Sequence, residues 1–403
     1  MLAILLLSFG SGLPFNLTSS TLQAWLADVS VDIKTIGIFS LVGVPYITKF
    51  LWAPLLDRYL PPFLGRRRGW ILIFQLLLAV AIAAMGFSHP ETNPWGMGAL
   101  ALVVTFLSAS QDIVMNAYQV DTIPPSERAL AAGAAAFGYR TAAMLAGAVL
   151  IAIAAATGWQ LAYMLVALLM LVSALATLWA PEPRVPGTPP RTLFDAVWKP
   201  LSDLMSRPGF WGFLFMILLY KFGDAFALSL YSAFMLKGVG ITLPQLATAK
   251  LDMTISTMAG VALGGWIYLR FGMFRSLLVL GIAQALTNLM YSWLAVVGKV
   301  YWLVLLATTV DTLVGGMGQA AFVAFLVSLC TVDFSATQYA ILSALAVVPR
   351  VVMSSAAGYV VSAIGWPRFF VVTCATALPG IVLLVLLRRQ LNALAARDVA
   401  TRR

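Results

Sequence analysis

Long apolar segments separated by short polar ones follow one another along all 403 residues of the chain. A helix needs about 20 mostly apolar residues to cross the hydrocarbon core of a bilayer. Twelve segments come close to that length, at residues 3–26, 36–56, 70–88, 97–119, 129–156, 159–180, 210–236, 245–269, 276–297, 300–330, 337–363 and 367–387. The pattern predicts an all-α membrane protein with twelve transmembrane helices.

The composition indicates the same class of protein. Hydrophobic residues make up 61% of the chain and charged residues only 10%, whereas a soluble domain carries about 25% charged residues. A net charge of +10 is compatible with nucleic-acid binding, but the basic residues lie between apolar segments and not on a polar domain. We therefore expect the lipid bilayer, and no nucleic acid, as the partner of this chain.

The distribution of Lys and Arg predicts the orientation of the helices. With both termini in the cytoplasm, sixteen basic residues lie in or beside inner loops, against four on the outer side, Lys34, Lys237, Lys299 and Arg368. Basic residues accumulate in cytoplasmic loops of membrane proteins. An even number of spans with both termini cytoplasmic is therefore expected.

Residues 181–209 differ from the rest of the chain because seven prolines interrupt them and charges are frequent. This segment predicts a cytoplasmic linker. It would separate an N-terminal six-helix half, residues 1–180, from a C-terminal six-helix half, residues 210–403, which ends in a short cytoplasmic tail.

The two halves repeat each other. The matching positions are Arg58 with Arg270, Arg140 with Arg350, and Phe9-Gly10 with Phe222-Gly223, at offsets of 212, 210 and 213 residues. Near-constant offsets in three pairs of segments indicate a duplicated unit with pseudo-symmetric halves. Transporters built this way bind their substrate near the bilayer midplane, between the repeats.

Nine ionisable residues fall inside the predicted spans. Each costs about 2.5–3.5 kcal/mol at the centre of a membrane helix on insertion scales, so most of them must form pairs or face water. The nine are Lys49, Asp112, Arg140, Lys221, Asp224, Lys250, Asp252, Asp311 and Arg350. For the set we expect a functional cavity; for any single residue, structural pairing between helices remains the alternative.

Polar residues recur at helical spacing within several spans. The stripes are Ser108, Asp112, Asn116 and Gln119; Gly12, Asn16, Ser19 and Gln23; Tyr339, Ser343, Arg350 and Ser354; and Lys250, Thr254 and Thr257. One polar face on an apolar helix is typical of a helix that lines a cavity. Hydroxyl stripes also occur where membrane helices pack on each other, and this alternative stays open for the first and eighth spans.

The sequence favours a proton gradient over ATP as the energy source. No G-x-x-x-x-G-K-[ST] phosphate-binding loop occurs in the 403 residues, so direct use of ATP has no support. The single histidine, His89, falls in an outer loop, which leaves carboxylates as proton carriers. We expect no cofactor and no metal, a proton gradient as the energy source, and Asp112 or Asp224 as the proton carrier, with Asp311 third.

The loop between the second and third spans contains an acid and several arginines. Asp57-Arg58 is followed by Gly65-Arg66-Arg67-Arg68-Gly69. This resembles the loop signature of major facilitator proteins, and the resemblance implies the major facilitator fold and a gating role for Asp57, Arg58, Arg66, Arg67 and Arg68. The equivalent positions of the second half, Arg270 to Arg275, are degenerate, which predicts an asymmetric cytoplasmic gate.

Further segments are similar to the AmpG muropeptide permease family. They are residues 21–25 (TLQAW), 39–43 (FSLVG), 49–59 (KFLWAPLLDRY), 65–70 (GRRRGW), 108–114 (SASQDIV), 219–227 (LYKFGDAFA) and 334–340 (FSATQYA). The resemblance extends over nearly the whole chain. It implies proton-driven import of N-acetylglucosaminyl-1,6-anhydro-N-acetylmuramyl (peptide) products across the inner membrane of a Gram-negative bacterium, for cell-wall recycling and β-lactamase induction.

A muropeptide is large, polar and anionic, and the polar residues inside the spans suit it. Lys221, Lys250, Arg140 and Arg350 are candidates to bind its negative charge, because arginine in particular binds carboxylates bidentately. The amides of Gln23, Asn16, Asn116 and Gln119 are candidates for its acetamido and hydroxyl groups. Trp25, Tyr46, Tyr139 and Tyr231 offer apolar faces to sugar rings; helix packing or a place in the interfacial aromatic belt is the alternative for such residues. A monomer is expected.

Other functions remain as alternatives. An acetyl-coenzyme A transporter or another organic-anion permease of the same superfamily is the runner-up. A drug exporter is disfavoured by the several cations inside the spans. A membrane-bound enzyme or a transporter-like sensor is disfavoured because no nucleophile–base or metal-ligand spacing is found in the sequence.

Overall fold

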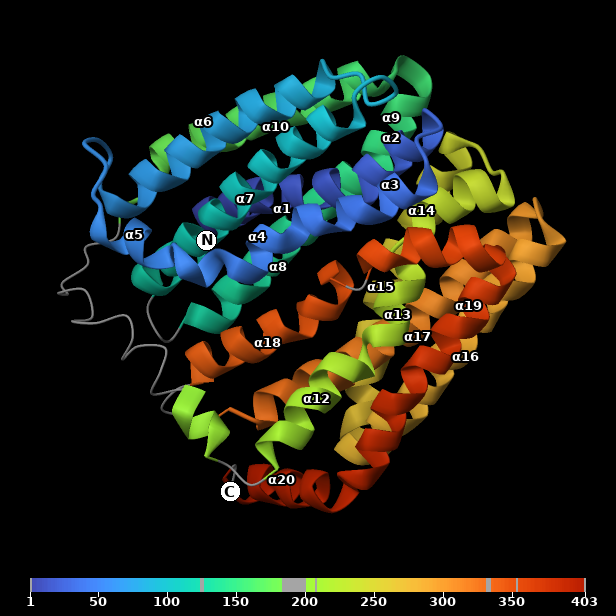
Figure 1. Cartoon of the computed structure of the whole chain (residues 1–403). Helices are drawn as coiled ribbons and strands as arrows, with labels where there is room; N and C mark the ends of the chain where they lie inside the picture. The colour runs from blue at the N-terminus through green and yellow to red at the C-terminus, as the bar shows by residue number, and fades with distance from the viewer. Residues whose placement is uncertain are drawn as a thin grey trace. The chain divides into compact units, whose positions relative to one another are not determined.

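The computed structural model describes residues 2–123, 127–182, 201–206, 209–330, 335–352 and 354–401. Helices are the only regular elements among these residues (Figure 1). The chain divides into two compact units: Met1–Arg191 with Thr242–Thr248, and Thr192–Ile241 with Ala249–Arg403. Most of the predicted linker, residues 183–200 and 207–208, lies outside the described residues, so its exact bounds stay a prediction.

The helices of the first unit follow the first six predicted spans. They are α1 (Leu2–Asn16), η1 (Leu17–Thr21), α2 (Leu22–Asp28), α3 (Ile33–Ile38), η2 (Phe39–Gly43), α4 (Val44–Thr48), η3 (Lys49–Leu51), α5 (Ala53–Arg58), α6 (Arg66–Gly86), α7 (Pro94–Thr122), α8 (Arg128–Met144), η5 (Leu145–Val149), α9 (Leu150–Thr157) and α10 (Trp159–Trp179). The first, second and fifth spans are therefore interrupted. Their π-helical and 3-10 turns are typical of functional segments of membrane helices.

The helices of the second unit follow the last six spans. They are α12 (Phe210–Tyr220), α13 (Phe222–Leu228), α14 (Tyr231–Ala233), η6 (Phe234–Val239), α15 (Leu243–Phe271), α16 (Met273–Val297), α17 (Tyr301–Ser328), α18 (Ser335–Val352), α19 (Ser354–Leu386) and α20 (Arg388–Thr401). The first turns of α15 belong to the first unit. The sequence did not predict α20, which forms in the expected tail and buries Leu391.

Ten helical stretches in the described part are long and apolar enough to cross a membrane. One of them, Ile341–Leu386, is 46 residues long and turns at Gly365, where φ is 76°, so it contains parts of the eleventh and twelfth predicted spans. The eighth predicted span is α15, whose 29 residues are long enough to cross a bilayer. It falls outside the ten stretches and carries Lys250, Asp252 and Arg270.

The same packing pattern occurs in each unit. In the first unit α6 packs against α7 and α10, and in the second α16 packs against α17 and α19 (Figure 1). Gly10 and Gly223 are equivalent as well: a Cβ at Gly10 would collide with Ser173 of α10, and a Cβ at Gly223 with the Thr373 and Ala377 region of α19. The repeat seen in the sequence therefore marks a repeated close contact between the first and last helix of each half.

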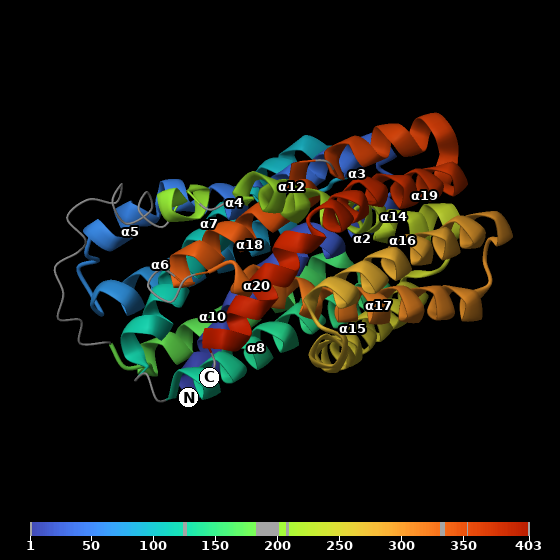
Figure 2. The same ribbon diagram turned by 90° about the horizontal axis from the view of Figure 1, so that it is seen from below.

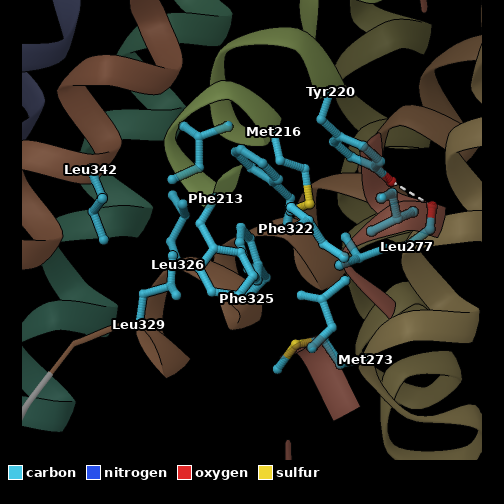
Figure 3. Packing of buried hydrophobic residues seen from close by; sticks show 14 of the residues in the cluster. Phe213, Met216, Tyr220, Met273, Leu277, Phe322, Phe325, Leu326, Leu329 and Leu342 are labelled. Carbon is cyan, nitrogen blue, oxygen red and sulfur yellow. Dashed lines mark hydrogen bonds between the residues drawn. The ribbon is translucent and has the colours of Figure 1, made fainter. Parts of the chain in front are cut away.

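The core of the second unit holds α12 against α16 and α17. Phe213, Tyr220, Leu277 and Phe322 belong to this buried cluster (Figure 3). The Tyr220 ring stacks on Phe322 at 5.5 Å, and its hydroxyl donates to the Leu277 carbonyl at 2.8 Å. Because Tyr220 is the last residue of α12, this contact places the next residue, Lys221, beside α16.

In the same unit, helix α15 packs against α17 (Figure 2). A Cβ at Gly260 would meet the backbone of α17, and one at Gly316 the backbone of α15. Small residues of this kind allow membrane helices to approach closely. The close approach places Asp252 of α15 within hydrogen-bonding distance of Thr309 on α17, at 2.9 Å.

Candidate functional site

Asp311 on α17 is the centre of a buried polar network in the second unit, and its side chain is almost inaccessible, at 1% relative exposure. Its Oδ1 accepts hydrogen bonds from Gln284 Nε2 at 2.8 Å and Thr287 Oγ1 at 2.6 Å, and its Oδ2 accepts one from the Tyr291 hydroxyl at 3.0 Å. The three donors are spaced by three and four residues on α16. They therefore form one polar face of that helix.

Gln284 connects Asp311 to a second carboxylate. Its Nε2 also donates to Asp224 Oδ1 at 3.0 Å, and Asp224 Oδ2 lies 3.5 Å from Lys221 Nζ. Two carboxylates and one ammonium thus share one network. Lys221 and Asp224 are three residues apart in the sequence and form an ion pair, and the network connects this pair to Asp311, which the spacing along the chain did not reveal.

A break in the helix directs Lys221 into this network. At Lys221 the backbone has φ −97° and ψ 5°, so α12 ends and α13 begins there. Broken helices in membrane proteins are found where the freed backbone is buried in protein or lines a cavity. Lys221 and Asp224 are 14% and 18% exposed, so their charges are largely shielded from solvent.

Lys250 lies on α15 in the same unit. Its side chain is 8% exposed, and its Nζ lies 5.1 Å from the centre of the Tyr231 ring. The Tyr231 hydroxyl is 3.0 Å from Thr308 Oγ1. A cation over an aromatic face is a favourable contact that replaces part of its hydration.

The first unit contains a different ion pair. Asp112 Oδ2 lies 3.1 Å from Lys49 Nζ, with the two side chains 27% and 30% exposed. Asp112 Oδ1 accepts a hydrogen bond from Ser11 at 2.7 Å. Asp112 therefore joins the first, second and fourth spans, and Lys49, which sits in the 3-10 turn η3, is its partner.

The remaining polar candidates of the first unit differ in their contacts. Asn16 donates to the Ala143 carbonyl at 2.7 Å, and Gln119 donates to Ser8 at 3.2 Å. Asn116 is exposed and Gln23 is half-buried. Asn16 and Gln119 thus connect helices. For Asn16 this is the alternative that the sequence left open for the stripe on the first span.

The aromatic and arginine candidates are placed as follows. Trp25 is 5% exposed and stacks on Trp159 with ring centres 5.6 Å apart, so only a small part of its surface remains for a ligand. Tyr139 is half-buried. Arg140 and Arg350 are both exposed, and their role as anion ligands stays a prediction.

The three arginines predicted in the loop, Arg66 to Arg68, form the first turn of α6. Two acids that the sequence did not indicate hold this turn. Arg67 Nε lies 2.7 Å from Asp121 Oδ2, and Glu182 accepts from the backbone amides of Arg67 at 2.9 Å and Arg68 at 3.0 Å. Glu182 therefore caps the N-terminus of α6, where a negative charge is favourable.

The other predicted gating residues lie as follows. Arg68 Nε donates to the Thr177 carbonyl at 3.0 Å, Arg66 is half-buried and Arg58 is exposed. The side chain of Asp57 lies outside the described part of the chain.

A signal for the network around Asp311 was present in the sequence. Gln284, Asn288 and Tyr291 recur at spacings of four and three on the ninth span, the same pattern that marked Asp112 on the fourth. The stripe carries no charge, so the ionisable residues of the spans do not mark it. Asp121 and Glu182 lie at the ends of predicted spans, where acids are common and indicate no partner.

The fold and these buried charges define a polytopic membrane transporter. Comparison with known proteins identifies the same class of protein. Residues 4–350 match the model of the Major Facilitator Superfamily. The chain belongs to this superfamily, and it is a transporter and not an enzyme. Its two repeated halves are those of the major facilitator fold.

Individual relatives narrow the family to the AmpG permeases. The chain is 45% identical to the anhydromuropeptide permease of Escherichia coli K12 over 391 residues, which cover 96% of this chain and 80% of that protein. It is 30% identical to the putative transporter AmpG 4 of Rickettsia conorii, over 96% of each. The resemblance predicted from the sequence motifs is confirmed.

Solved structures share the fold at low sequence identity. A bacterial homologue of the human lysosomal transporter Spinster, in an inward-facing and unoccupied conformation, matches with a TM-score of 0.77 and 15% identity, over 98% of this chain and 97% of that one. A D-xylose–proton symporter matches with a TM-score of 0.72 and 13% identity, over 95% and 96%. These matches support the fold alone.

Proposed function

We propose that the chain imports anhydro-muropeptides, with or without their peptide, from the periplasm to the cytoplasm in symport with protons. The assignment of the substrate rests on the 45% identity to the anhydromuropeptide permease of Escherichia coli over 96% of this chain. The protein would lie in the inner membrane with both termini cytoplasmic, as a monomer, and return cell-wall fragments for recycling and β-lactamase induction.

Proton symport follows from the charge of the substrate. Moving one negative charge into a negative interior is opposed by about 2.3 kcal/mol per 100 mV. A co-transported proton cancels one such charge and adds the free energy of the pH gradient. No cofactor is needed for this.

The carboxylates of the second unit are the best-placed proton carriers. Asp311 and Asp224 share Gln284 as a donor, and Lys221 pairs with Asp224. Asp112 has its own lysine and is more exposed. We therefore rank Asp311 and Asp224 above Asp112, a change from the order expected from the sequence.

Substrate binding is assigned to cations of both units and to one amide of the first. Lys221, Lys250 and Arg350 in the second unit and Arg140 in the first supply positive charge, and the exposed Asn116 supplies an amide. Arg67, with Asp121 and Glu182, forms the cytoplasmic contact set that must loosen when the protein changes conformation.

The test is uptake of labelled anhydro-muropeptide by proteoliposomes that contain the purified protein. We expect accumulation when the outside is acidic, and its loss on addition of a protonophore. Undiminished accumulation in protonophore would exclude proton symport. Transport of acetyl-coenzyme A or another organic anion, with no uptake of the muropeptide, would replace the substrate with that of the runner-up function.

A further inference from the structure

A small pocket lies beside the Lys221–Asp224 pair, between the α12–α13 break and α16. Lys221, Asp224, Gln284 and Asn288 supply its polar lining, and small residues such as Gly281 leave the space for it. All of these residues belong to the second unit.

Three buried polar atoms around this pocket have no hydrogen-bond partner within the described part of the protein: Gln284 Oε1, Asn288 Oδ1 and Asn288 Nδ2. Asn288 is 0% exposed and Gln284 is 7% exposed. A buried polar group without a partner costs about 1–3 kcal/mol, and proteins usually satisfy such groups with internal water where the site is polar. Since Gln284 and Asn288 are four residues apart on α16, both amides face the pocket from one side.

The charges around the pocket do not balance. Asp224 and Asp311 carry two negative charges and Lys221 one positive charge, and both N–H groups of Gln284 are used by the two carboxylates. The nearest groups from neighbouring helices do not cancel the excess. Tyr291 is a neutral donor, and Lys250 is directed at the ring of Tyr231. One further proton would make the buried cluster neutral.

We propose that Asp224 and Asp311 share one proton, that the pocket holds the water through which this proton enters, and that Gln284 is the positioning residue for the pair. This deepens the proton symport proposed above and rests on it. In the loading step a hydronium ion in the pocket transfers a proton to an Asp224 oxygen. An O–H bond forms there, one O–H bond of the hydronium breaks, and neutral water remains; release is the reverse.

The chemistry of a carboxamide explains the choice of glutamine. With both carboxylates ionised, Gln284 Nε2 donates to each of them, as observed. When one carboxylate is protonated, its O–H becomes a donor, and Gln284 Oε1 can accept it after the amide turns over. A glutamine therefore satisfies both protonation states, which neither leucine nor a carboxylate at position 284 would do.

The first experiment compares two activities of the same reconstituted protein: accumulation driven by a pH gradient, and counterflow exchange without a gradient. Coupling free energies between sites commonly correspond to changes of about 5–150-fold. For Gln284→Leu and Asn288→Leu we expect the ratio of driven accumulation to exchange to fall about tenfold, with exchange retained.

The matched control is Gln75→Leu. Gln75 is also 0% exposed and joins Ser173 and Thr177 by hydrogen bonds of 3.0 and 2.6 Å, but it contacts no carboxylate among the described residues. Its substitution should lower protein abundance without changing the ratio. An unchanged ratio in Gln284→Leu, or an equal loss of both activities, would overturn the positioning role. Higher thermal stability with an unchanged ratio in Asn288→Leu would show a dry pocket and overturn the water route.

A second readout needs no substrate. Infrared spectra of the purified protein should contain the carbonyl band of a protonated carboxylic acid. Asp224→Asn and Asp311→Asn should each remove it, Gln284→Leu should shift it, and Asp112→Asn should leave it. If no band responds to the first two variants, the shared proton is refuted even where muropeptide transport is normal. If the band behaves as expected but no muropeptide is transported, the proposed substrate fails and the shared proton stands.

Discussion

Both units of this transporter contain a Lys–Asp pair within a predicted span, and the two pairs differ in exposure and in charge balance. Lys49 and Asp112 are 30% and 27% exposed and bear one charge of each sign. Lys221 and Asp224 are 14% and 18% exposed, and Gln284 connects them to Asp311, which is 1% exposed.

The differences in exposure and charge balance indicate that the two ion pairs have different functions. A balanced pair with access to solvent has a small desolvation cost and suits a contact that breaks and re-forms. A cluster with one carboxylate in excess, shielded from solvent, gains a large electrostatic stabilisation when it binds a proton. The comparison predicts that energy coupling lies in the second unit, and that the pair of the first unit serves conformational change.

The largest expected effect concerns the excess carboxylate. Asp311→Asn should lower accumulation driven by a pH gradient by about 100-fold, the order of a lost proton-transfer group, and retain counterflow exchange. Asp112→Asn should reduce both activities to a similar and smaller extent. The measurement is labelled uptake in proteoliposomes at matched protein abundance. Abolished accumulation in Asp112→Asn together with normal accumulation in Asp311→Asn would reverse the comparison.

The second effect concerns the stability of the two ion pairs. Lys221→Met should destabilise the protein by about 3–5 kcal/mol, the usual loss when one partner of a buried pair is removed. Lys49→Met should cost about 1 kcal/mol, as expected for an accessible pair. Thermal unfolding of both variants in the same detergent measures this. Adding Asp224→Asn to Lys221→Met should recover part of the loss, and equal destabilisation by the two lysine variants would contradict the assignment.

A smaller effect is expected at the symmetry-related arginines. Arg350→Lys should weaken binding of a peptide-bearing muropeptide by about tenfold, because lysine cannot bind a carboxylate bidentately. The peptide-free disaccharide, which lacks the peptide carboxylates, should be affected less. For Arg140→Lys we expect less selectivity between the two substrates. Competition assays at equal abundance test both, and an equal loss for the two substrates in Arg350→Lys would assign that residue to structure or gating.

The smallest effect concerns the cap of α6. Glu182→Gln keeps the hydrogen-bond acceptor but removes the charge at the helix N-terminus, and this should cost about 0.3–1 kcal/mol. We expect a slightly lower unfolding temperature and an altered transport rate, since Glu182 also holds the first turn of α6, which carries Arg67. Arg275→Gln, in the first turn of α16, is the control from the second unit, and a similar change in rate there would remove the asymmetry predicted for the gate.

The sequence by itself determined the class of protein, the course of the spans, the duplication and the family. Hydropathy and helical period are local properties, so the segments around α6, α7, α10 and α16 could be read within a few residues of their ends. The interruptions in the first and seventh spans could not, because a π-helical turn or the break at Lys221 leaves hydropathy unchanged.

The tertiary structure decided which charges meet. The sequence placed Asp311 third among the proton carriers, because none of its neighbours along the chain is charged. Its partners Gln284, Thr287 and Tyr291 come from another helix, and only the packing of α16 against α17 brings them together. Likewise Asp121 and Glu182 meet Arg67 across more than 50 residues of chain. Helical spacing predicts which residues share a face. What that face contacts depends on the rotation of each helix about its axis, and packing sets this rotation.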